Sequence, residues 1–345
     1  MGVLKTGELR YRGLVGTGGI GSGSYFLLGG NATLGREENR GGRFLERQDY
    51  CKLHTVGQYL KTLLGQGFEV IPIGKVGADE AGERLLREME ETGLSLRHVR
   101  RLPGARTLFS LCFLYPDGSG GSLTAEDSAS AALGVEDILR GEEDFAALGK
   151  KGIALAAPEV PLPARGKLLE LGGRHGLFRA AGFTNREMAE IRDSGLLEQV
   201  DLLALNLEEA KAAAGIAAEL KAAEEAAEEA VSRLAASYPR LNLLITAGAR
   251  GSWSWDGTVL RRDPALPVET AGASTSGGAH LSGVLAGLAA GLSLWEAQQL
   301  GSLTAAASLT GPPTIHKSLS REMLRSLAYK RKDVSFSVMR LLEAG

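Results

Sequence analysis

Residues 246–291, TAGARGSWSWDGTVLRRDPALPVETAGASTSGGAHLSGVLAGLAAG, set the architecture that we expect for the whole chain. The apolar run at 241–245 predicts a buried strand that ends at Thr246. Small residues at 270–278 then lead directly into an apolar pattern that predicts a helix from about Ala279. A glycine-rich turn that opens a helix presents unpaired backbone N–H groups at the positive end of the helix dipole, which predicts an anion-binding site. Close helix packing is the alternative explanation for these glycines.

Upstream of this stretch, strand patterns alternate with helix patterns. Predicted strands at 152–156, 176–181 and 201–205 are followed by predicted helices at 163–172, 185–194 and 207–214. Such alternation predicts a parallel sheet with right-handed crossovers, in which ligands lie beyond the carboxyl ends of the strands. Asn206 and Glu209 follow one such end, so we expect them close to a ligand.

Length and composition favour one large α/β domain that binds a small molecule. The chain has 345 residues, of which 44% are hydrophobic, and it has no long disordered tract, so we interpret residues 1–345 as a single domain. A formal net charge of -2 provides no basic surface. This charge argues against nucleic acid and against anionic membrane surfaces as partners.

The cysteines and the N-terminal sequence bear on the compartment. Cys51 and Cys112 lie far apart without a CxxC pair, which suits a reducing compartment and argues against a disulfide framework and a zinc site. The sequence MGVLKTGELRYRG has no apolar signal-peptide core, and no run approaches the roughly 20 apolar residues of a membrane span. We therefore expect a soluble, cytoplasmic protein.

A second glycine-containing motif lies in the N-terminal half. Residues 68–73 predict a strand, and the run GKVGADEAG at 74–82 leads into a helix pattern over 80–92. Asp79 directly precedes this helix and is expected to be its N-cap, without a chemical role. Residues 20–50 are polar with scattered apolar pairs, which is typical of a loop or a lid.

In their order along the chain, these motifs resemble those of the ribokinase (PfkB) family of carbohydrate kinases. The matches are G-x-V-G-x-D-x-x-G at 74–82, N-x-x-E at 206–209 and T-x-G-x-x-G at 246–251. The resemblance implies an α/β fold, namely a three-layer α/β/α sandwich with a mainly parallel central sheet and a small β lid. The lid would be built from about residues 20–50 and 104–125, and a homodimer would form through it.

The resemblance also implies the reaction. The protein would transfer the γ-phosphoryl group of ATP to a hydroxyl of a sugar or nucleoside, with Mg²⁺ as the cofactor. The nucleotide would be bound by Asn206, Glu209, Thr246, Gly248 and Gly251. Glu209 would contact the metal through water, and residues 305–310 would line the adenine pocket.

The chain departs from the family where a G-A-G-D motif should provide an anion hole and a general base. When the downstream helix sets the alignment, the anion hole consists of Thr275, Ser276, Gly277 and Gly278, and Gly278 takes the position of the base Asp. When residues 269–275 are matched instead, Thr275 takes that position. We prefer the first alignment, because it needs no insertion at the helix start, although neither supplies a carboxylate. His280 is a candidate substitute base by its usual pKa, and a core-facing replacement for the family's Phe is the alternative.

The sugar ligands of the family are also missing. Residues 21–24 occupy the neighbourhood of the expected sugar-binding Asp, and Val56 occupies the position of the expected Asn. Asn31, Asp49 and Arg36 are the candidate substrate ligands in their place, and the alternative is that they are surface loop residues. Two functions are consistent with this pattern: an ATP-dependent carbohydrate kinase impaired by the loss of its base, and a non-catalytic protein that binds nucleotide or sugar as a sensor or scaffold.

Overall fold

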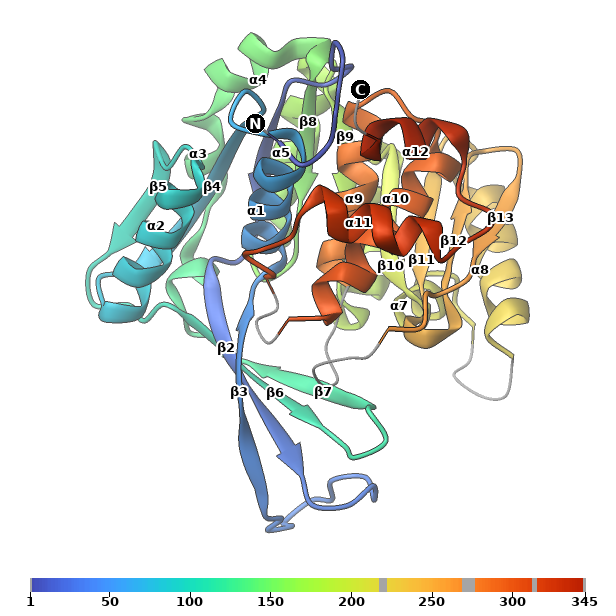
Figure 1. Ribbon diagram of the computed structural model, residues 1–345. Coiled ribbons are helices and arrows are strands. Elements are labelled where there is room, and N and C mark those ends of the chain that lie inside the picture. The colour runs from blue at the N-terminus through green and yellow to red at the C-terminus, as the bar shows by residue number, and fades with distance from the viewer. Residues whose placement is uncertain (1, 217–221, 269–276, 312–314, 344–345) are drawn as a thin grey trace.

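A nine-stranded sheet forms the centre of the molecule (Figure 1). The computed structural model describes residues 2–216, 222–268, 277–311 and 315–343. The strand order is β13-β12-β11-β10-β9-β8-β1-β4-β5, in which β12 is antiparallel to both neighbours and the other neighbouring pairs are parallel. The strands are β1 (Gly13–Thr17), β4 (Glu69–Gly77), β5 (His98–Leu102), β8 (Gly152–Ala156), β9 (Phe178–Ala181), β10 (Leu202–Asn206), β11 (Asn242–Thr246), β12 (Ser252–Trp255) and β13 (Leu260–Asp263).

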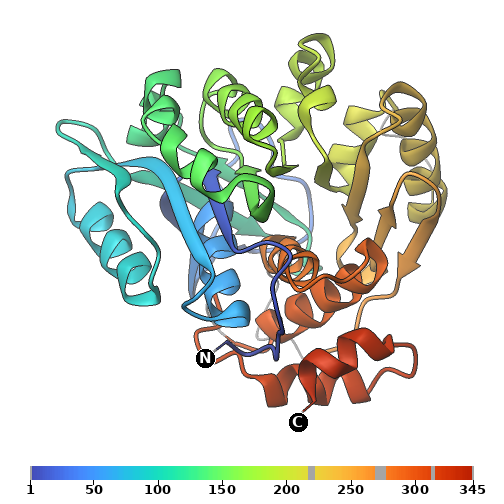
Figure 2. The same ribbon diagram turned by 90° about the horizontal axis from the view of Figure 1, so that it is seen from above.

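Helices cover both faces of this sheet and complete three layers (Figure 2). One side carries α1 (Lys52–Leu64), α2 (Glu80–Thr92), α9 (Gly277–Ala289), α10 (Leu294–Leu309), α11 (Arg321–Tyr329) and α12 (Phe336–Leu342). The other carries α3 (Val135–Leu139), α4 (Glu142–Leu148), α5 (Leu162–His175), α6 (Met188–Asp193), α7 (Leu207–Ala213) and α8 (Ala223–Ser237).

The strands are apolar on both faces because each face packs against helices. In β1, Leu14 belongs to the core on the α1 side, whereas its neighbour Val15 belongs to the core on the α5 side. Val70 and Ile71 in β4 alternate in the same way. The expected α/β/α sandwich with a mainly parallel sheet is therefore confirmed.

The predicted N-cap of α2 is also confirmed, and it has a second role. Asp79 Oδ1 accepts a hydrogen bond from Gly82 N at 2.8 Å, as a cap should. The same carboxylate accepts hydrogen bonds from Thr107 N at 2.8 Å and from Thr107 Oγ1 at 2.6 Å. Asp79 thus attaches the start of α2 to the segment that enters the second sheet.

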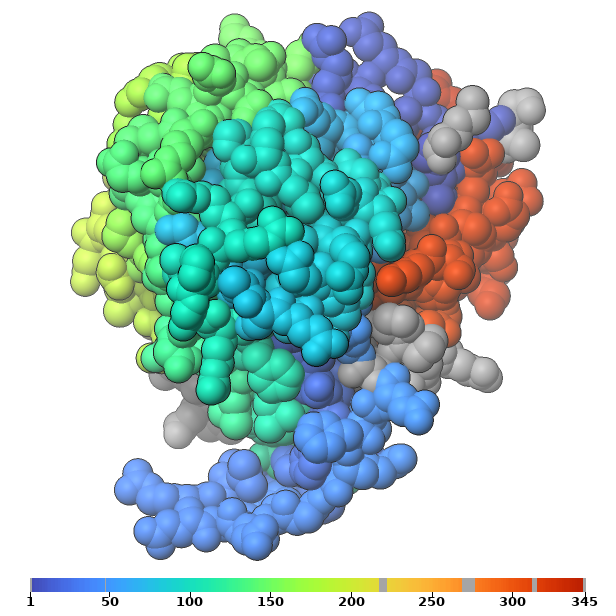
Figure 3. Space-filling model, turned by 90° about the vertical axis from the view of Figure 1, so that its left-hand side faces the viewer, coloured from blue at the N-terminus to red at the C-terminus, as the bar shows by residue number. Residues whose placement is uncertain are grey.

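A four-stranded sheet projects from the carboxyl edge of the central sheet as the expected small lid (Figures 1 and 3). Its order is β3-β2-β6-β7, formed by β2 (Gly21–Leu28), β3 (Gly42–Tyr50), β6 (Leu108–Leu114) and β7 (Gly120–Thr124). β2 follows β1 after three residues, and α1 begins one residue after β3 ends, so the lid is connected directly to the edge that holds the predicted motifs.

Among the described residues, no helix is both long and apolar enough to cross a membrane.

Candidate active site

Two predicted motifs meet at the carboxyl edge of the central sheet. β10 and β11 are parallel neighbours, and Asn206 at the end of β10 is the register partner of Thr246 at the end of β11. Asn206 Oδ1 accepts a hydrogen bond from Glu209 N at 2.8 Å, and Glu209 Oε2 accepts one from Asn206 N at 2.7 Å. This reciprocal capping box holds both side chains at the edge and leaves Asn206 Nδ2 available to donate to a ligand.

The T-x-G-x-x-G turn beside Asn206 has a shape that requires its glycines. Ala247 N donates a hydrogen bond to Gly251 O at 2.8 Å and so closes the turn. Gly248 and Gly251 have φ of 57° and 95°, values that favour glycine. A Cβ on Gly251 would lie 2.4 Å from the carbonyl oxygen of Asp263. The turn therefore packs directly against the end of β13.

Charged side chains surround the Glu209 carboxylate. Burial raises the pKa of Glu209, and Glu187 raises it further, whereas Lys52 and the backbone N–H of Asn206 lower it. Lys52 is the first residue of α1, and its Nζ lies 3.2 Å from the point where a Cβ on Gly182 would stand. Lys52 therefore brings a positive charge from α1 to the loop that follows β9.

The donors at this edge fit a magnesium ion that is held mainly by water and phosphate. Mg²⁺ prefers oxygen ligands and usually keeps several waters beside one or two carboxylates. Burial and the negative charge of Glu187 raise the pKa of Glu209. A bound cation would favour the ionised carboxylate and so oppose both effects. Within the described ranges, no group of three or more His, Cys, Asp or Glu residues could hold a metal ion.

The predicted anion-hole segment is described only in part. Thr275 and Ser276 lie outside the described residues, and α9 begins at Gly277. Gly278 is in the first turn of α9, where a Cβ would lie 3.0 Å from Thr55 Cγ2 of α1. The helix start therefore lies against the helix that follows the lid.

His280 is directed away from this edge into the interior. Its Nε2 lies 3.2 Å from Ser252 Oγ on β12 and 3.4 Å from Ser302 Oγ on α10. Burial lowers the pKa of His280 to about 4, and its Nδ1 is enclosed without a hydrogen-bond partner in the described part of the chain. These surroundings match the core-facing alternative considered for this residue.

Asn31 and Asp49, two of the candidate substrate ligands, lie in different parts of the lid. Asn31 follows the end of β2, and its Oδ1 accepts a hydrogen bond from Asp117 N at 3.0 Å, so it links two lid loops. Asp49 lies on β3 close to α1, where its carboxylate accepts hydrogen bonds from Tyr25 Oη at 3.1 Å and Cys112 Sγ at 3.2 Å. The structure therefore brings Asp49, but not Asn31, to the side of the lid that joins the central sheet.

Glu159 is a further carboxylate at this edge, and the sequence interpretation missed it. It follows the end of β8 by three residues, and its carboxylate interacts with the Cys51 thiol, Lys52 and Asp49. Its position just beyond a buried strand was the available signal, because side chains there point to the ligand edge of a parallel sheet. Lys52 had no comparable signal, since only the tertiary structure brings the start of α1 to the end of β9.

Buried Arg165 on α5 holds the loops behind these carboxylates. Its guanidinium donates to the carbonyl oxygen of Val160 at 3.1 Å and to that of Gly182 at 3.4 Å, and it forms an ion pair with Glu187. Arg165 thereby joins the loop after β8 to the loop after β9. Carboxylates, one lysine, a capped helix start and a glycine turn are thus assembled along one edge, an arrangement suited to binding and transferring phosphate.

The family profile described as pfkB family carbohydrate kinase matches residues 59–321, which is most of the chain. The protein belongs to the PfkB family. Members of this family are carbohydrate kinases that use ATP. The matched range includes the motifs at 74–82, 206–209 and 246–251, so the resemblance based on these motifs is confirmed.

Solved structures of several kinases share this fold at low sequence identity. Ribokinase from Giardia lamblia is 16% identical with a TM-score of 0.75, and the match covers 91% of this chain and 98% of that one. Adenosine kinase from Sinorhizobium meliloti is 19% identical with a TM-score of 0.68, over 93% and 100% of the two chains. A nucleoside kinase from Burkholderia thailandensis, solved in complex with inosine, is 18% identical with a TM-score of 0.68, over 91% and 96%. These similarities establish the fold of this PfkB protein.

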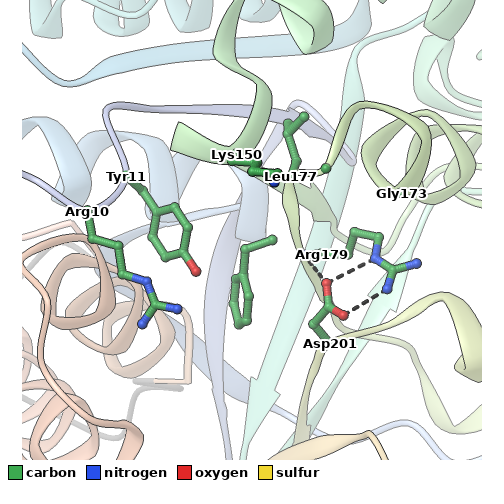
Figure 4. A pocket seen from close by; sticks show the side chains of 9 residues that line it. Arg10, Tyr11, Lys150, Gly173, Leu177, Arg179 and Asp201 are labelled. Carbon is green, nitrogen blue, oxygen red and sulfur yellow. Dashed lines mark hydrogen bonds and ion pairs between the residues drawn. The ribbon is translucent and has the colours of Figure 1, made fainter.

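A separate hollow of about 470 Å³ lies at the opposite, amino edge of the sheet (Figure 4). Arg10, Tyr11, Lys150, Arg179 and Asp201 are among its lining residues. Asp201 accepts two hydrogen bonds from the Arg179 guanidinium, at 2.9 and 2.8 Å. Because Asp201 also accepts from Arg179 N at 2.8 Å, this pair joins the start of β9 to the start of β10. The hollow is therefore distinct from the edge that carries the PfkB motifs.

Proposed function

We propose that this PfkB protein transfers the γ-phosphoryl group of ATP to a hydroxyl group of a sugar or nucleoside at the carboxyl edge of its central sheet. The observation that supports this function best is the register pair of Asn206 and Thr246. It places the N-x-x-E cap beside the T-x-G-x-x-G turn, so one nucleotide can contact both motifs. In the proposed complex, the nucleotide lies beside residues 246–251 and its phosphates point toward the start of α9.

The charges at this edge support phosphoryl transfer in particular. Such catalysis consists mainly of positioning the groups and stabilising the negative charge of the transferred phosphoryl. Lys52 and the backbone N–H groups at the start of α9 supply positive charge, and Asn206 Nδ2 donates to a phosphate oxygen. A Mg²⁺ ion held near Glu209 through water would neutralise the β- and γ-phosphates. The acceptor lies between this edge and the lid, beside Asp49.

The rate depends on which group accepts the proton of the attacking hydroxyl. Gly278 occupies the position that we assign to the family's base, and glycine has no proton-accepting group. A positioned base contributes about 10²–10⁴-fold to such rates. If no other group of the chain accepts the proton, kcat lies below the roughly 1–100 s⁻¹ that is typical of kinases.

The test combines nucleotide-binding calorimetry with an assay of ADP release. Mg–ATP and Mg–ADP are titrated into the protein, and ADP formation is then followed with a panel of pentoses, hexoses and nucleosides. We expect nucleotide binding and acceptor-dependent ADP release. Failure to bind nucleotide at millimolar concentration would contradict the proposal. Binding of nucleotide and acceptor without ADP formation would identify a non-catalytic binder instead.

A further inference from the structure

The backbone at Glu159 is strained at the ligand edge. The φ of Glu159 is 75°. Among the described residues other than glycine, Glu37 is the only other one with a positive φ, and it is exposed in a lid loop. The left-handed conformation is unfavourable for a residue with a Cβ. Two hydrogen bonds hold the backbone just before it: Ala157 N donates to Thr17 O at 2.8 Å, and Gly19 N donates to Pro158 O at 2.9 Å. Strain of this kind is concentrated at functional sites.

The strained backbone directs a carboxylate oxygen into an enclosed space without a partner. Glu159 Oε2 is shielded from solvent in this structure and accepts no hydrogen bond from the described residues. It lies 2.6 Å from the point where a Cβ on Gly19 would stand, so a larger residue at position 19 would displace it. An enclosed acceptor without a donor is costly and is rare in native proteins. A hydroxyl group of a bound acceptor is a donor that would complete this site.

The carboxylate of Glu159 is close to the position that lacks a base. Glu159 Oε2 and the thiol of Cys51, the N-cap of α1, lie 2.6 and 3.4 Å from the same point beside Gly19, and Thr55 one turn later lies against Gly278. Thr55 N donates to Cys51 O at 3.1 Å, so the two contacts are separated by one turn of α1. Four residues of an α-helix rise about 6 Å. Glu159 and Gly278 therefore both adjoin the start of α1, about one helical turn apart.

We propose that Glu159 is the general base of this kinase and that its Oε2 accepts the proton of the attacking hydroxyl group. The acceptor oxygen forms a bond to the γ-phosphorus while its O–H bond breaks and the proton moves to Glu159. The bond between the γ-phosphorus and the β–γ bridging oxygen breaks, and its electron pair leaves with ADP. The proton then passes to water. This inference rests on the proposed kinase function.

The electrostatic surroundings suit such a base. The pKa of Glu159 is raised to about 7. Burial is the main cause and Asp49 adds to it, whereas Cys51, Lys52 and Arg165 act in the opposite direction. A base with a pKa near the working pH combines a large ionised fraction with useful proton affinity. Titratable and charged groups from four elements interact electrostatically with Glu159. They are Asp49 on β3, Cys51 and Lys52 at the start of α1, Cys112 on β6 and Arg165 on α5.

The test compares wild type with Glu159→Gln, which keeps the size of the side chain but not its basicity. ADP release is measured from about pH 5.5 to about pH 9 with the panel acceptor that gives the highest kcat/KM. Wild-type kcat should rise to a plateau with a midpoint near the pKa of about 7. Glu159→Gln should lower kcat by about 10²–10⁴-fold with little change in KM, and should abolish the midpoint. Glu37→Gln changes the other positive-φ glutamate and should leave kcat and the midpoint unchanged.

Each other outcome overturns the inference. An unchanged kcat in Glu159→Gln, a loss confined to KM, or a midpoint that persists would show that Glu159 does not accept the proton. If thermal unfolding shows that Glu159→Gln does not fold, a wild-type kcat that is flat between about pH 6 and about pH 8 still contradicts it. No ADP release from wild type with any acceptor would remove the proposed kinase function, and the base with it. Release that Glu159→Gln leaves unchanged would remove the base alone.

Discussion

Gly278 offers a direct way to restore a carboxylate at the helix start. It lies in the first turn of α9 and has no positive φ, so Asp there avoids the left-handed conformation. Its Cβ would meet Thr55 Cγ2 at 3.0 Å, and a shift of a few tenths of an ångström relieves this contact. In the Glu159→Gln background, which lacks the proposed base, we expect Gly278→Asp to raise kcat at least about tenfold, which is ~1.4 kcal/mol of barrier, in the ADP-release assay.

Gly277→Asp is the matched control for this gain. A Cβ on Gly277 meets nothing within 4 Å in the described structure, but it points about 100° away around the helix. It should therefore produce no increase. No increase from Gly278→Asp in the Glu159→Gln background, with nucleotide and acceptor both bound, would show that the acceptor hydroxyl is not aligned with the helix start.

His280 links stability to acid pH, because it is buried in its neutral form. The pKa of its imidazole falls to about 4 from 6.5, so the unfolded chain binds the proton more tightly. The contribution of neutral His280 to the free energy of unfolding is complete above about pH 6.5 and is lost as the pH falls through 4. Between about pH 7 and about pH 4, we expect the free energy of unfolding to fall by up to ~3 kcal/mol more in wild type than in His280→Asn. Urea denaturation measures the difference, and equal slopes for the two proteins would refute it.

At the scale of elements, the capping box of α7 gives Asn206 two separable roles. Oδ1 caps the helix, whereas we assign Nδ2 to a phosphate oxygen. Asn206→Ala should lower the free energy of unfolding by ~1 kcal/mol and weaken Mg–ATP binding. Asn206→Ser keeps a good cap and should preserve stability, yet weaken Mg–ATP binding about tenfold through loss of a hydrogen bond to a charged group. Calorimetry and urea denaturation measure the two effects, and a Ser variant with unchanged affinity would contradict the assignment to phosphate.

At the scale of the whole molecule, the lid has an exposed apolar face. Phe26 pairs with Phe44 across β2 and β3, and their rings lie 5.0 Å apart. Phe44, Phe109 and Leu123 are 65%, 48% and 60% exposed. The register of the sheet places them on the same face, because paired residues and residues two or four apart point to one side. Exposed apolar patches of this kind mark interfaces, so we propose that two lids pair in a homodimer.

We expect light scattering after size exclusion to give twice the 36.3 kDa mass of one chain. Introducing two charges with Phe44→Glu and Leu123→Lys should shift the protein to monomer, because these charges would be buried in the interface. Phe336→Glu alters a side chain that is 78% exposed on α12 and should leave the dimer intact. A monomeric wild type would contradict pairing through the lid.

The layers of the fold followed from local patterns that depend only on neighbours in the chain. Continuous apolar strands, amphipathic helices and the Asp79 cap predict elements because burial and capping act over a few residues. The proximity of Asn206 to Thr246 could also be predicted, since parallel strands align their carboxyl ends. The contacts of Lys52, Arg165 and the enclosed Glu159 oxygen could not be predicted from the sequence, because they involve segments remote in the chain. The interior position of His280 depended likewise on β12 and α10 packing around it. Charge placement and burial at this site are therefore properties of the tertiary structure.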